Sequence, residues 1–429
     1  MRPLRAIAAV AALVVPLVAL TACADVPPFR CDADEQCGAG GRCEEDGACS
    51  FLDDRCHTER RYGGEGPPAV ADTCVGDASG AIVWLTAGSD FSCGRAEDGR
   101  LWCWGDNTSG GLGRDDVGKS GTPAPVAGLE GVTDADGGEF TSCAVAGGRV
   151  HCWGRGSGGQ LGDDTTADRS RPAPVMDIDG AVAVELGEHH GCALDDAGTV
   201  WCWGSNNDGE TGAPGEAMMK RPKRVNQLPA ATVIAVGGQV SCALAGDETY
   251  CWGKNTNGQL GLGDTSARNR PEAVAAWAGA TALAVGGEHT CALLADGTVR
   301  CAGANDFGQL GDGTTTDRSR PVDVTGLTGV VEVVAMDWST CARDGAGVVR
   351  CWGRGDVGQL GGGTENRRMA DGVVELGRPA VGLAGGENHA CAMTDDGCVW
   401  CWGSDEKEQL GDGKGRGGEG VRPVMLSCW

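Results

Sequence analysis

The motif Cys-Trp-Gly recurs at a nearly fixed interval, and this interval restricts the fold more than any other feature of the chain. Its cysteine falls at seven positions spaced by 49, 50, 49, 50, 50 and 50 residues: Cys103, Cys152, Cys202, Cys251, Cys301, Cys351 and Cys401. A period near fifty residues indicates a repeat architecture. No segment keeps a helical period, and short strand-like runs alternate with Gly turns, as at 321–324, 330–335, 340–343 and 348–352. Four strands in each of seven repeats predict an all-β, seven-bladed β-propeller.

The residues around the motif carry a family resemblance. In the fourth repeat they read Trp-Gly-Lys-Asn-Thr-Asn-Gly-Gln-Leu-Gly over 252–261, and Arg270-Pro271 follows. This pattern resembles the regulator of chromosome condensation repeat, and the likeness runs from about Ala81 to Trp429. The resemblance implies the same seven-bladed propeller that the spacing predicts.

Three repeats depart from the pattern. Ala302 replaces the tryptophan, Gly-Glu-Thr-Gly at 209–212 replaces Gly-Gln-Leu-Gly, and Arg368-Met369 replaces Arg-Pro. We expect each departure to affect one blade and not the ring. The first repeat lacks the Arg-Pro-Val strand that precedes the others, whereas the chain ends with an additional one at 422–426. The C-terminus is therefore predicted to complete the first blade.

A second cysteine lies nine or ten residues before each of the seven markers. The pairs are Cys93 and Cys103, Cys143 and Cys152, Cys192 and Cys202, Cys242 and Cys251, Cys291 and Cys301, Cys341 and Cys351, and Cys391 and Cys401. A difference of nine suits a two-residue primed turn, at 147–148 or 246–247, and a difference of ten suits a three-residue loop with a left-handed Gly in third place. The paired cysteines then lie opposite each other, with Cα atoms about 4.5–5.5 Å apart. We predict one hairpin disulfide in each blade.

The same hairpins explain the tryptophans. Neighbouring residues of a strand point to opposite faces, so Cys103 faces one adjacent blade while Trp102 and Trp104 face the other. We expect the tryptophans to pack between blades and not to line a binding surface.

The N-terminus predicts export. Arg2 and Arg5 precede a 15-residue apolar stretch at 6–20, which fits a signal peptide over 1–22. Leu-Thr-Ala-Cys at 20–23 resembles the bacterial lipobox, which implies that Cys23 is acylated and becomes the first mature residue. Ala24 favours the outer membrane over the inner one. We therefore expect an exported lipoprotein on the outer membrane, in the periplasm or exposed at the surface.

A Cys-rich stalk is predicted over 23–76, before a propeller over 77–429. Few apolar residues separate its cysteines, so it needs disulfides to hold it together. Besides Cys23 and the hairpin pairs, eight cysteines remain: Cys31, Cys37, Cys43, Cys49, Cys56, Cys74, Cys398 and Cys428. Bridges from Cys56 to Cys74 and from Cys398 to Cys428 are the simplest assignment, and one from Cys74 to Cys428 is the alternative. The spacing in the stalk does not suit zinc.

Net charge and cysteine content restrict the kind of partner and the cellular compartment. The formal charge is −25, which argues against nucleic acid because phosphate binding needs a cationic face. The chain contains 23 cysteines, which indicate an oxidising compartment.

Several motifs suggest chemistry that their context does not support. Residues 113–120 match the phosphate-loop pattern, but they lead into Gly-Thr-Pro instead of a helix. Arg354-Gly355-Asp356 looks like an adhesion tripeptide, yet it occupies a degenerate repeat position. Gly-Asp-Gly-Thr at 311–314 could ligate calcium weakly, but Asp and Gly are ordinary turn residues.

His190, His289 and His389 each lie two residues before the first cysteine of a repeat. Three imidazoles converging on the axis could bind a metal. Because they belong to different blades, and because the family uses a histidine here structurally, we expect a structural role, with no metal and no cofactor.

The sequence favours a non-catalytic, monomeric binding platform for an envelope or extracellular protein. The alternatives are an inhibitor of a secreted or periplasmic enzyme and a propeller that binds or degrades polysaccharide, which would need clustered acids near the axis. The family name also suggests guanine-nucleotide exchange on a small GTPase, but the predicted compartment argues against it.

Overall fold

The structure is a computed structural model that describes residues 41–43, 49–52, 60–62, 82–115, 118–415 and 418–424. These residues fall in two compact units, a small sheet before residue 63 and a larger unit from Ile82 onward. The small unit contains three antiparallel strands, β1 (Gly41–Cys43), β2 (Cys49–Leu52) and β3 (Arg60–Tyr62), and the backbone register places Cys43 opposite Cys49. No helix in the described part of the chain has the length and apolarity needed to cross a membrane.

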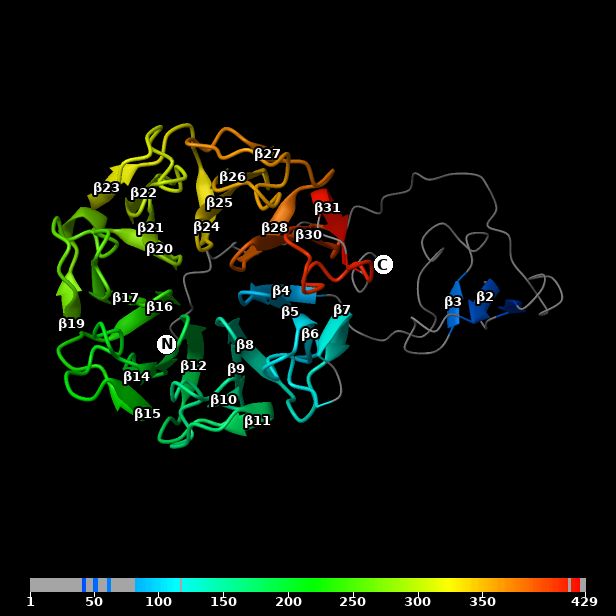
Figure 1. Cartoon of the computed structure of the whole chain (residues 1–429), viewed down its shortest axis with the longest axis horizontal. Coiled ribbons are helices and arrows are strands. Elements are labelled where there is room, and N and C mark those ends of the chain that lie inside the picture. The colour runs from blue at the N-terminus through cyan, green and yellow to red at the C-terminus, as the bar shows by residue number, and fades with distance from the viewer. Residues whose placement is uncertain are drawn as a thin grey trace, which may run out of the picture. The chain divides into compact units, whose positions relative to one another are not determined.

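The larger unit is a ring of seven four-stranded antiparallel sheets, which confirms the predicted propeller (Figure 1). We number the blades 1 to 7 along the chain. The inner strands are β4 (Ile82–Ala87), β8 (Val132–Gly137), β12 (Ala181–Leu186), β16 (Ala231–Gly237), β20 (Ala280–Val285), β24 (Val330–Ala335) and β28 (Ala380–Gly385). The second strands are β5 (Phe91–Ala96), β9 (Thr141–Ala146), β13 (His190–Asp195), β17 (Val240–Ala245), β21 (His289–Leu294), β25 (Ser339–Asp344) and β29 (His389–Thr394).

The other two strands of each sheet complete the blades toward the rim. The third strands are β6 (Leu101–Asp106), β10 (Arg149–Gly154), β14 (Val200–Ser205), β18 (Glu248–Gly253), β22 (Val299–Gly303), β26 (Val349–Gly353) and β30 (Val399–Gly403). The outer strands are β7 (Lys119–Pro125), β11 (Arg169–Pro174), β15 (Met218–Arg224), β19 (Arg268–Ala273), β23 (Arg318–Asp323), β27 (Val373–Val374) and β31 (Gly418–Pro423). Strand β27 has two residues and follows the departure at Arg368-Met369, so that departure is confined to blade 6.

The turns between the second and third strands have the predicted geometry. Gly147 and Gly148 both have positive φ in the two-residue turn of blade 2. The three-residue loops all place a left-handed glycine third: Gly99, Gly198, Gly297, Gly347 and Gly397, with φ of 80 to 83°. Because a side chain at these angles is strained, glycine fixes the turn and therefore the register of the hairpin.

All seven predicted hairpin disulfides form. In every pair the two cysteines are direct cross-strand partners with Cα atoms 4.1 Å apart, slightly closer than the predicted separation. Each bridge therefore fastens the two middle strands of its own blade. Cys23, Cys56, Cys74 and Cys428 lie outside the described residues, so the predicted acylation and the remaining pairings keep the status of predictions.

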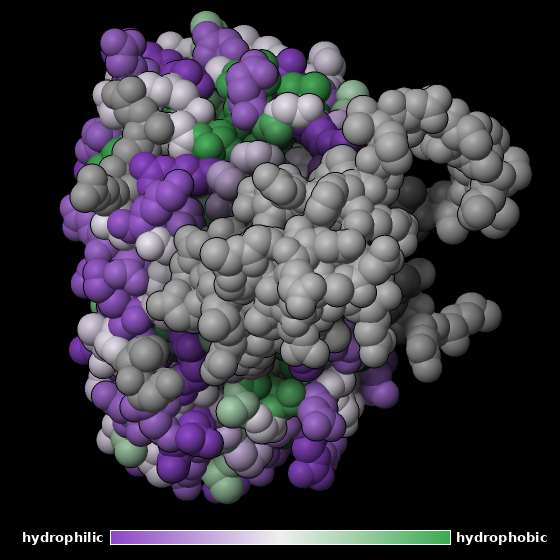
Figure 2. Space-filling model, turned by 90° about the vertical axis from the view of Figure 1, so that its right-hand side faces the viewer, coloured by the Kyte–Doolittle hydropathy of each residue, from purple (hydrophilic) through white to green (hydrophobic). Residues whose placement is uncertain are grey.

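The core lies between the blades, as the strand alternation predicted. Cys103 packs with blade 2 residues such as Val132 and Trp153, whereas Trp102 and Trp104 pack with blade 7 residues such as Leu410. Among the described residues, few large hydrophobic side chains are exposed: Met176, Val182, Met218, Val357, Met369, Val373 and Val381. The coloured residues that are visible in Figure 2 are accordingly more often hydrophilic than hydrophobic.

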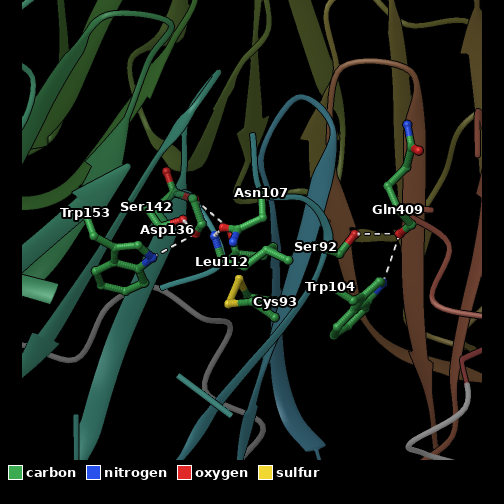
Figure 3. Close-up of a disulfide and its surroundings, with 12 residues drawn as sticks. Ser92, Cys93, Trp104, Asn107, Leu112, Asp136, Ser142, Trp153 and Gln409 are labelled. Carbon is green, nitrogen blue, oxygen red and sulfur yellow. Dashed lines mark hydrogen bonds between the residues drawn. A yellow bond between two sulfur atoms is a disulfide. The ribbon is translucent and has the colours of Figure 1, made fainter. Parts of the chain in front are cut away.

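Each tryptophan of the motif also fastens its blade to the preceding one. Its indole Nε1 donates to a backbone carbonyl in the loop between the third and outer strands of the neighbouring blade, at 2.7 to 3.0 Å. The pairs are Trp104 with Gln409, Trp153 with Gly111, Trp203 with Gln160, Trp252 with Glu210, Trp352 with Gln309 and Trp402 with Gln359. The first pair joins blade 1 to blade 7 and closes the ring (Figure 3).

Blade 5 replaces its missing tryptophan from elsewhere in the sequence. Trp277, at the end of the 3₁₀ helix η2 (Ala275–Trp277), is fully buried in the interface that contains Ala302. Its ring lies 3.1 Å from the Cβ position of Gly261, where the corresponding glycines of other blades face a motif tryptophan. Trp277 therefore fills the space that Ala302 leaves.

The predicted closure by the C-terminal strand is wrong. Strand β31 pairs with β30 inside blade 7, and blade 1 has its own outer strand, β7. The Arg-Pro strand completes the blade before it and does not begin the next one. The prediction failed because β7 carries Thr122-Pro123 instead of Arg-Pro and was not recognised as the outer strand of its blade.

Candidate functional site

The inner strands surround a central channel, and one of its mouths is formed by seven short loops. The cavity has a volume of about 290 Å³. We call the segments between the first and second strands of each blade the mouth loops; they are residues 88–90, 138–140, 187–189, 238–239, 286–288, 336–338 and 386–388.

Glycine allows the mouth loops to approach one another closely. A Cβ on Gly88 would lie 2.5 Å from the carbonyl oxygen of Gly138, and one on Gly138 would lie 2.5 Å from that of Gly187. Backbone bonds join neighbouring loops, as from Ser89 N to Gly138 O at 3.1 Å. Since no larger residue fits at these contacts, the Gly-Gly pairs of the repeats keep the mouth narrow and fix the residues that follow them.

Acidic side chains lie in the mouth loops and form what we call the acidic ring. Each member is within electrostatic range of at least one other, and four of them, Glu139, Glu188, Asp337 and Glu387, line the channel. The acidic ring consists of Asp90, Glu139, Glu188, Glu288, Asp337 and Glu387. Carboxylates from six of the seven blades therefore gather at one end of the axis.

Only part of this negative charge is balanced. Lys254 pairs with Glu288 at 2.9 Å, and His189 lies 3.2 Å from Glu139. Among the described residues, no ion pair or hydrogen bond is found for the Asp337 carboxylate, and the charged groups that act on it are all negative. The ring therefore carries excess negative charge.

Burial raises the pKa values of Asp90, Glu139, Asp337 and Glu387, and nearby carboxylates add to the rise. Burial, with repulsion from the negative charges of Glu387, Glu188, Glu139 and Glu288, raises the pKa of Asp337 to about 7. Burial is also the main cause of the raised pKa of Glu387, with Asp90 adding repulsion. The mouth thus favours any ligand that brings positive charge.

Half-buried aromatic side chains lie beside the acidic ring between blades 5 and 6. The rings of Phe307 and Trp338 meet edge to face with centroids 5.7 Å apart, and the Arg354 guanidinium lies 5.5 Å from the Phe307 ring centroid. We call Phe307, Trp338 and Arg354 the aromatic cluster. Trp338 belongs to a mouth loop directly after Asp337, so apolar surface and uncompensated charge are adjacent.

Acids deeper in the channel wall have a structural role. The Asp136 carboxylate accepts bonds from Thr86 Oγ1 at 2.6 Å and from the Leu186 amide at 2.8 Å, so it joins the inner strands of blades 1, 2 and 3. Burial raises its pKa to about 6, although these bonds favour the charged form. Figure 3 includes Asp136 among the residues around the first disulfide.

The three candidate histidines hold neighbouring blades together, which confirms the structural expectation. Each is buried and shares a hydrogen bond of 2.7 to 2.8 Å with a hydroxyl of the next blade: His190 with Ser241, His289 with Thr340 and His389 with Ser92. Burial lowers the pKa of each to about 4. Among the described residues, no group of three or more His, Cys, Asp or Glu side chains is arranged to hold a metal ion.

The other motifs are used within the fold. Lys119, from the phosphate-loop-like segment, begins strand β7 and pairs with Glu408 at 2.9 Å. Arg354 and Asp356 of the adhesion-like tripeptide pair with each other at 2.7 Å. Asp312 of the calcium-like turn accepts bonds from Thr314 and Arg318 inside its own loop. The charged groups named here, all in the described part of the chain, are thus paired within the propeller.

Sequence reasoning missed the acidic ring. It named clustered acids near the axis as the mark of a polysaccharide enzyme but did not identify any. The signal was present, because Glu139, Glu188, Asp337 and Glu387 each lie four residues before the first cysteine of their repeat. Comparing this position, four residues before the first cysteine, among the repeats predicts acidic side chains around one mouth of the channel.

Similarity to known proteins agrees with this architecture. No curated protein matches the chain. The human WBSCR16 crystal structure has a TM-score of 0.68 and 22% identity, covering 74% of this chain and 88% of that one. Prp20p from Saccharomyces cerevisiae, described with its binding to Gsp1p and histones, has a TM-score of 0.66 and 21% identity, covering 74% and 84%. These likenesses show a shared fold.

Models of the regulator of chromosome condensation (RCC1) repeat match most of the propeller. One matches residues 98–145, 147–194, 197–244, 247–293 and 296–342, which together exceed half of the chain. A second matches 85–110, 181–210, 280–309 and 380–409. With its seven blades and recurrent interblade contacts, this chain belongs to the regulator of chromosome condensation repeat family.

Proposed function

We propose that this chain is an exported, lipid-anchored and non-catalytic propeller that binds a protein partner through its mouth loops. The observation that carries the proposal is the acidic ring, whose negative charge is only partly balanced within the chain. Excess charge around a narrow opening attracts a complementary partner and repels a wrong one. The partner that fits is a protein segment rich in lysine or arginine.

The location part of the proposal starts from the disulfides. Seven hairpin bridges indicate an oxidising, non-cytoplasmic environment. Cys23 would carry the lipid. Labelled palmitate should enter the chain in its native host, and a Cys23→Ala variant should not be labelled. Failure to label the parent chain, together with cytosolic fractionation, would contradict the lipid anchor.

The same environment argues against nucleotide exchange. Prp20p binds Gsp1p and histones, which gives a precedent for protein recognition on this fold. Exchange requires a cytosolic small GTPase, and a disulfide-bonded, exported propeller would not meet one. We therefore propose protein binding without guanine-nucleotide exchange.

A pair of matched variants tests the binding proposal. The mouth variant neutralises four members of the acidic ring: Glu139→Gln, Glu188→Gln, Asp337→Asn and Glu387→Gln. The control variant neutralises four exposed acids outside the mouth loops: Glu130→Gln, Glu216→Gln, Asp247→Asn and Glu375→Gln. Both variants lose the same four formal negative charges, so a difference between them reports the position of these charges and not their number.

The assay is affinity capture on the disulfide-bonded full chain, with solubilised envelope and spent medium as sources and mass spectrometry as the readout. We expect a basic protein that is retained by the parent chain and the control variant, released by salt and lost from the mouth variant. Retention of the same proteins by the mouth variant, or of none by the parent chain, would contradict the proposal.

Polysaccharide cleavage is the second candidate, and one feature favours it. Burial raises the pKa of Asp337 to about 7, and its carboxylate is within electrostatic range of Glu387. An acid of raised pKa near a second carboxylate is the arrangement that glycosidases use. New reducing ends from envelope polysaccharides, lost in Asp337→Asn, would establish an enzyme. Unchanged polysaccharide would leave the binding function.

A further inference from the structure

The aromatic cluster has no counterpart at the corresponding positions of most blades. The position of Trp338 holds Asp90, Phe140, His189, Gln239, Glu288 and Asn388 in the other blades. The position of Phe307 holds Ser109, Gly158, Asp208, Asn257, Val357 and Lys407. Blade 2 has a related contact, in which the Arg155 guanidinium lies 5.4 Å from the Phe140 ring centroid, but Ser109 stands where blade 5 has Phe307. Among the described residues, the pair of contacting rings is therefore particular to blades 5 and 6, where Val357 is 39% exposed.

The cluster is held in place by its backbone. The Arg354 amide donates to the Trp338 carbonyl at 2.9 Å, and the Phe307 amide donates to Gln309 Oε1 at 3.0 Å. The Arg354 guanidinium also pairs with Asp356 at 2.7 Å. The two rings are thus presented on fixed loops while staying partly accessible, which lowers the entropy cost of binding.

This position places an apolar surface directly beside uncompensated negative charge. Asp337 precedes Trp338 in the same mouth loop and lines the channel. Tryptophan and arginine are the residues most enriched at the energetic centres of protein interfaces. A ligand that contacts Trp338 can therefore also reach the acidic ring.

We propose that the aromatic cluster is the anchor point of the interface: it binds an apolar side chain of the partner while adjacent lysine or arginine residues of that same segment lie over the acidic ring. This inference rests on the proposed function and adds the sequence character of the partner. The segment combines a large aliphatic or aromatic residue with basic neighbours. Charge complementarity selects this occupant over a neutral polysaccharide.

Three short labelled peptides of equal length serve as probes: alternating leucine and lysine, alternating serine and lysine, and alternating leucine and glutamate. Fluorescence anisotropy with the disulfide-bonded full chain measures their dissociation constants. We expect the leucine–lysine peptide to bind most tightly, the serine–lysine peptide to bind at least about tenfold more weakly, and the leucine–glutamate peptide not to bind.

Variants locate the anchor. Trp338→Ala and Phe307→Ala should each weaken the leucine–lysine peptide by about tenfold or more and leave the serine–lysine peptide nearly unchanged. Trp201→Ala is the matched control, because Trp201 is also a partly buried tryptophan but lies on strand β14, outside the mouth loops. If Trp338→Ala does not fold, Trp338→Phe keeps a ring at this position and should bind with intermediate affinity.

The outcomes separate this inference from the proposed function. Unchanged leucine–lysine binding in both Trp338→Ala and Phe307→Ala would overturn the anchor, while its loss in the mouth variant would still support the platform. Equal affinity for the two lysine peptides would also overturn the anchor. Failure of both lysine peptides to bind the parent chain would remove the cationic-partner proposal and the anchor with it. Trp338-dependent binding of a neutral oligosaccharide, with no peptide binding, would replace both by glycan recognition.

Discussion

Replacing Asp337 by asparagine should stabilise the propeller, and the gain should grow with pH. An acid whose pKa is higher in the folded state binds more protons when folded, so its contribution to stability is lost as pH rises. For Asp337 the window runs from the ordinary value of 3.8 to about 7. Each pH unit of difference corresponds to about 1.4 kcal/mol, so the full effect at pH 7 is about 4 kcal/mol.

The assay is urea unfolding of the disulfide-bonded chain and of Asp337→Asn at several values between pH 4 and 8. The two free energies of unfolding should nearly coincide at pH 4 and should diverge toward neutral pH, with the variant more stable. A Glu130→Gln control should run parallel to the parent chain, because Glu130 is exposed and lies outside the mouth loops. A constant difference across this range, or a destabilised variant, would refute the reasoning about uncompensated charge.

Three further perturbations test contacts between blades and the disulfide within one blade. Trp277→Ala should lower the free energy of unfolding by about 3–5 kcal/mol, because it empties the space left by Ala302, and calorimetry should show this loss. Replacing Cys341 and Cys351 by serine should cost about 2–3 kcal/mol in denaturant unfolding, since the bridge closes a short loop. The pKa of His289 falls from 6.5 to about 4 on folding, so the free energy of unfolding should decrease as pH is lowered from 6.5 to 4. His289→Gln should remove up to about 3 kcal/mol of this pH dependence. An unchanged slope of the free energy of unfolding against pH would contradict this assignment.

The recurrent features of the fold were predictable because they repeat. The distance between paired cysteines fixed the hairpin turns, and strand alternation then assigned Cys103 and Trp104 to opposite interfaces. The histidines were correctly expected to be structural because they lie in different blades. Such arguments succeed where the same local feature, such as a hairpin turn of fixed length, occurs in all seven repeats.

Features that depend on contacts between different repeats were not predictable in the same way. Trp277 lies 25 residues before Ala302, and nothing in the repeat pattern links the two residues. The closure was wrong because strand β7 lacks the Arg-Pro signature that marks most outer strands. The acidic ring becomes visible only when loops of six blades are superimposed, and its pKa shifts arise from burial that the sequence does not display.

The central claim is that the acidic ring recruits a cationic protein segment. The most direct test measures the affinity of the alternating leucine–lysine peptide for the parent chain, the mouth variant and the control variant, at low and at high salt. The account predicts binding to the parent chain and the control variant, at least about tenfold weaker binding to the mouth variant, and a loss of this difference as salt screens the charges. Equal affinity of the mouth and control variants at low salt would contradict it.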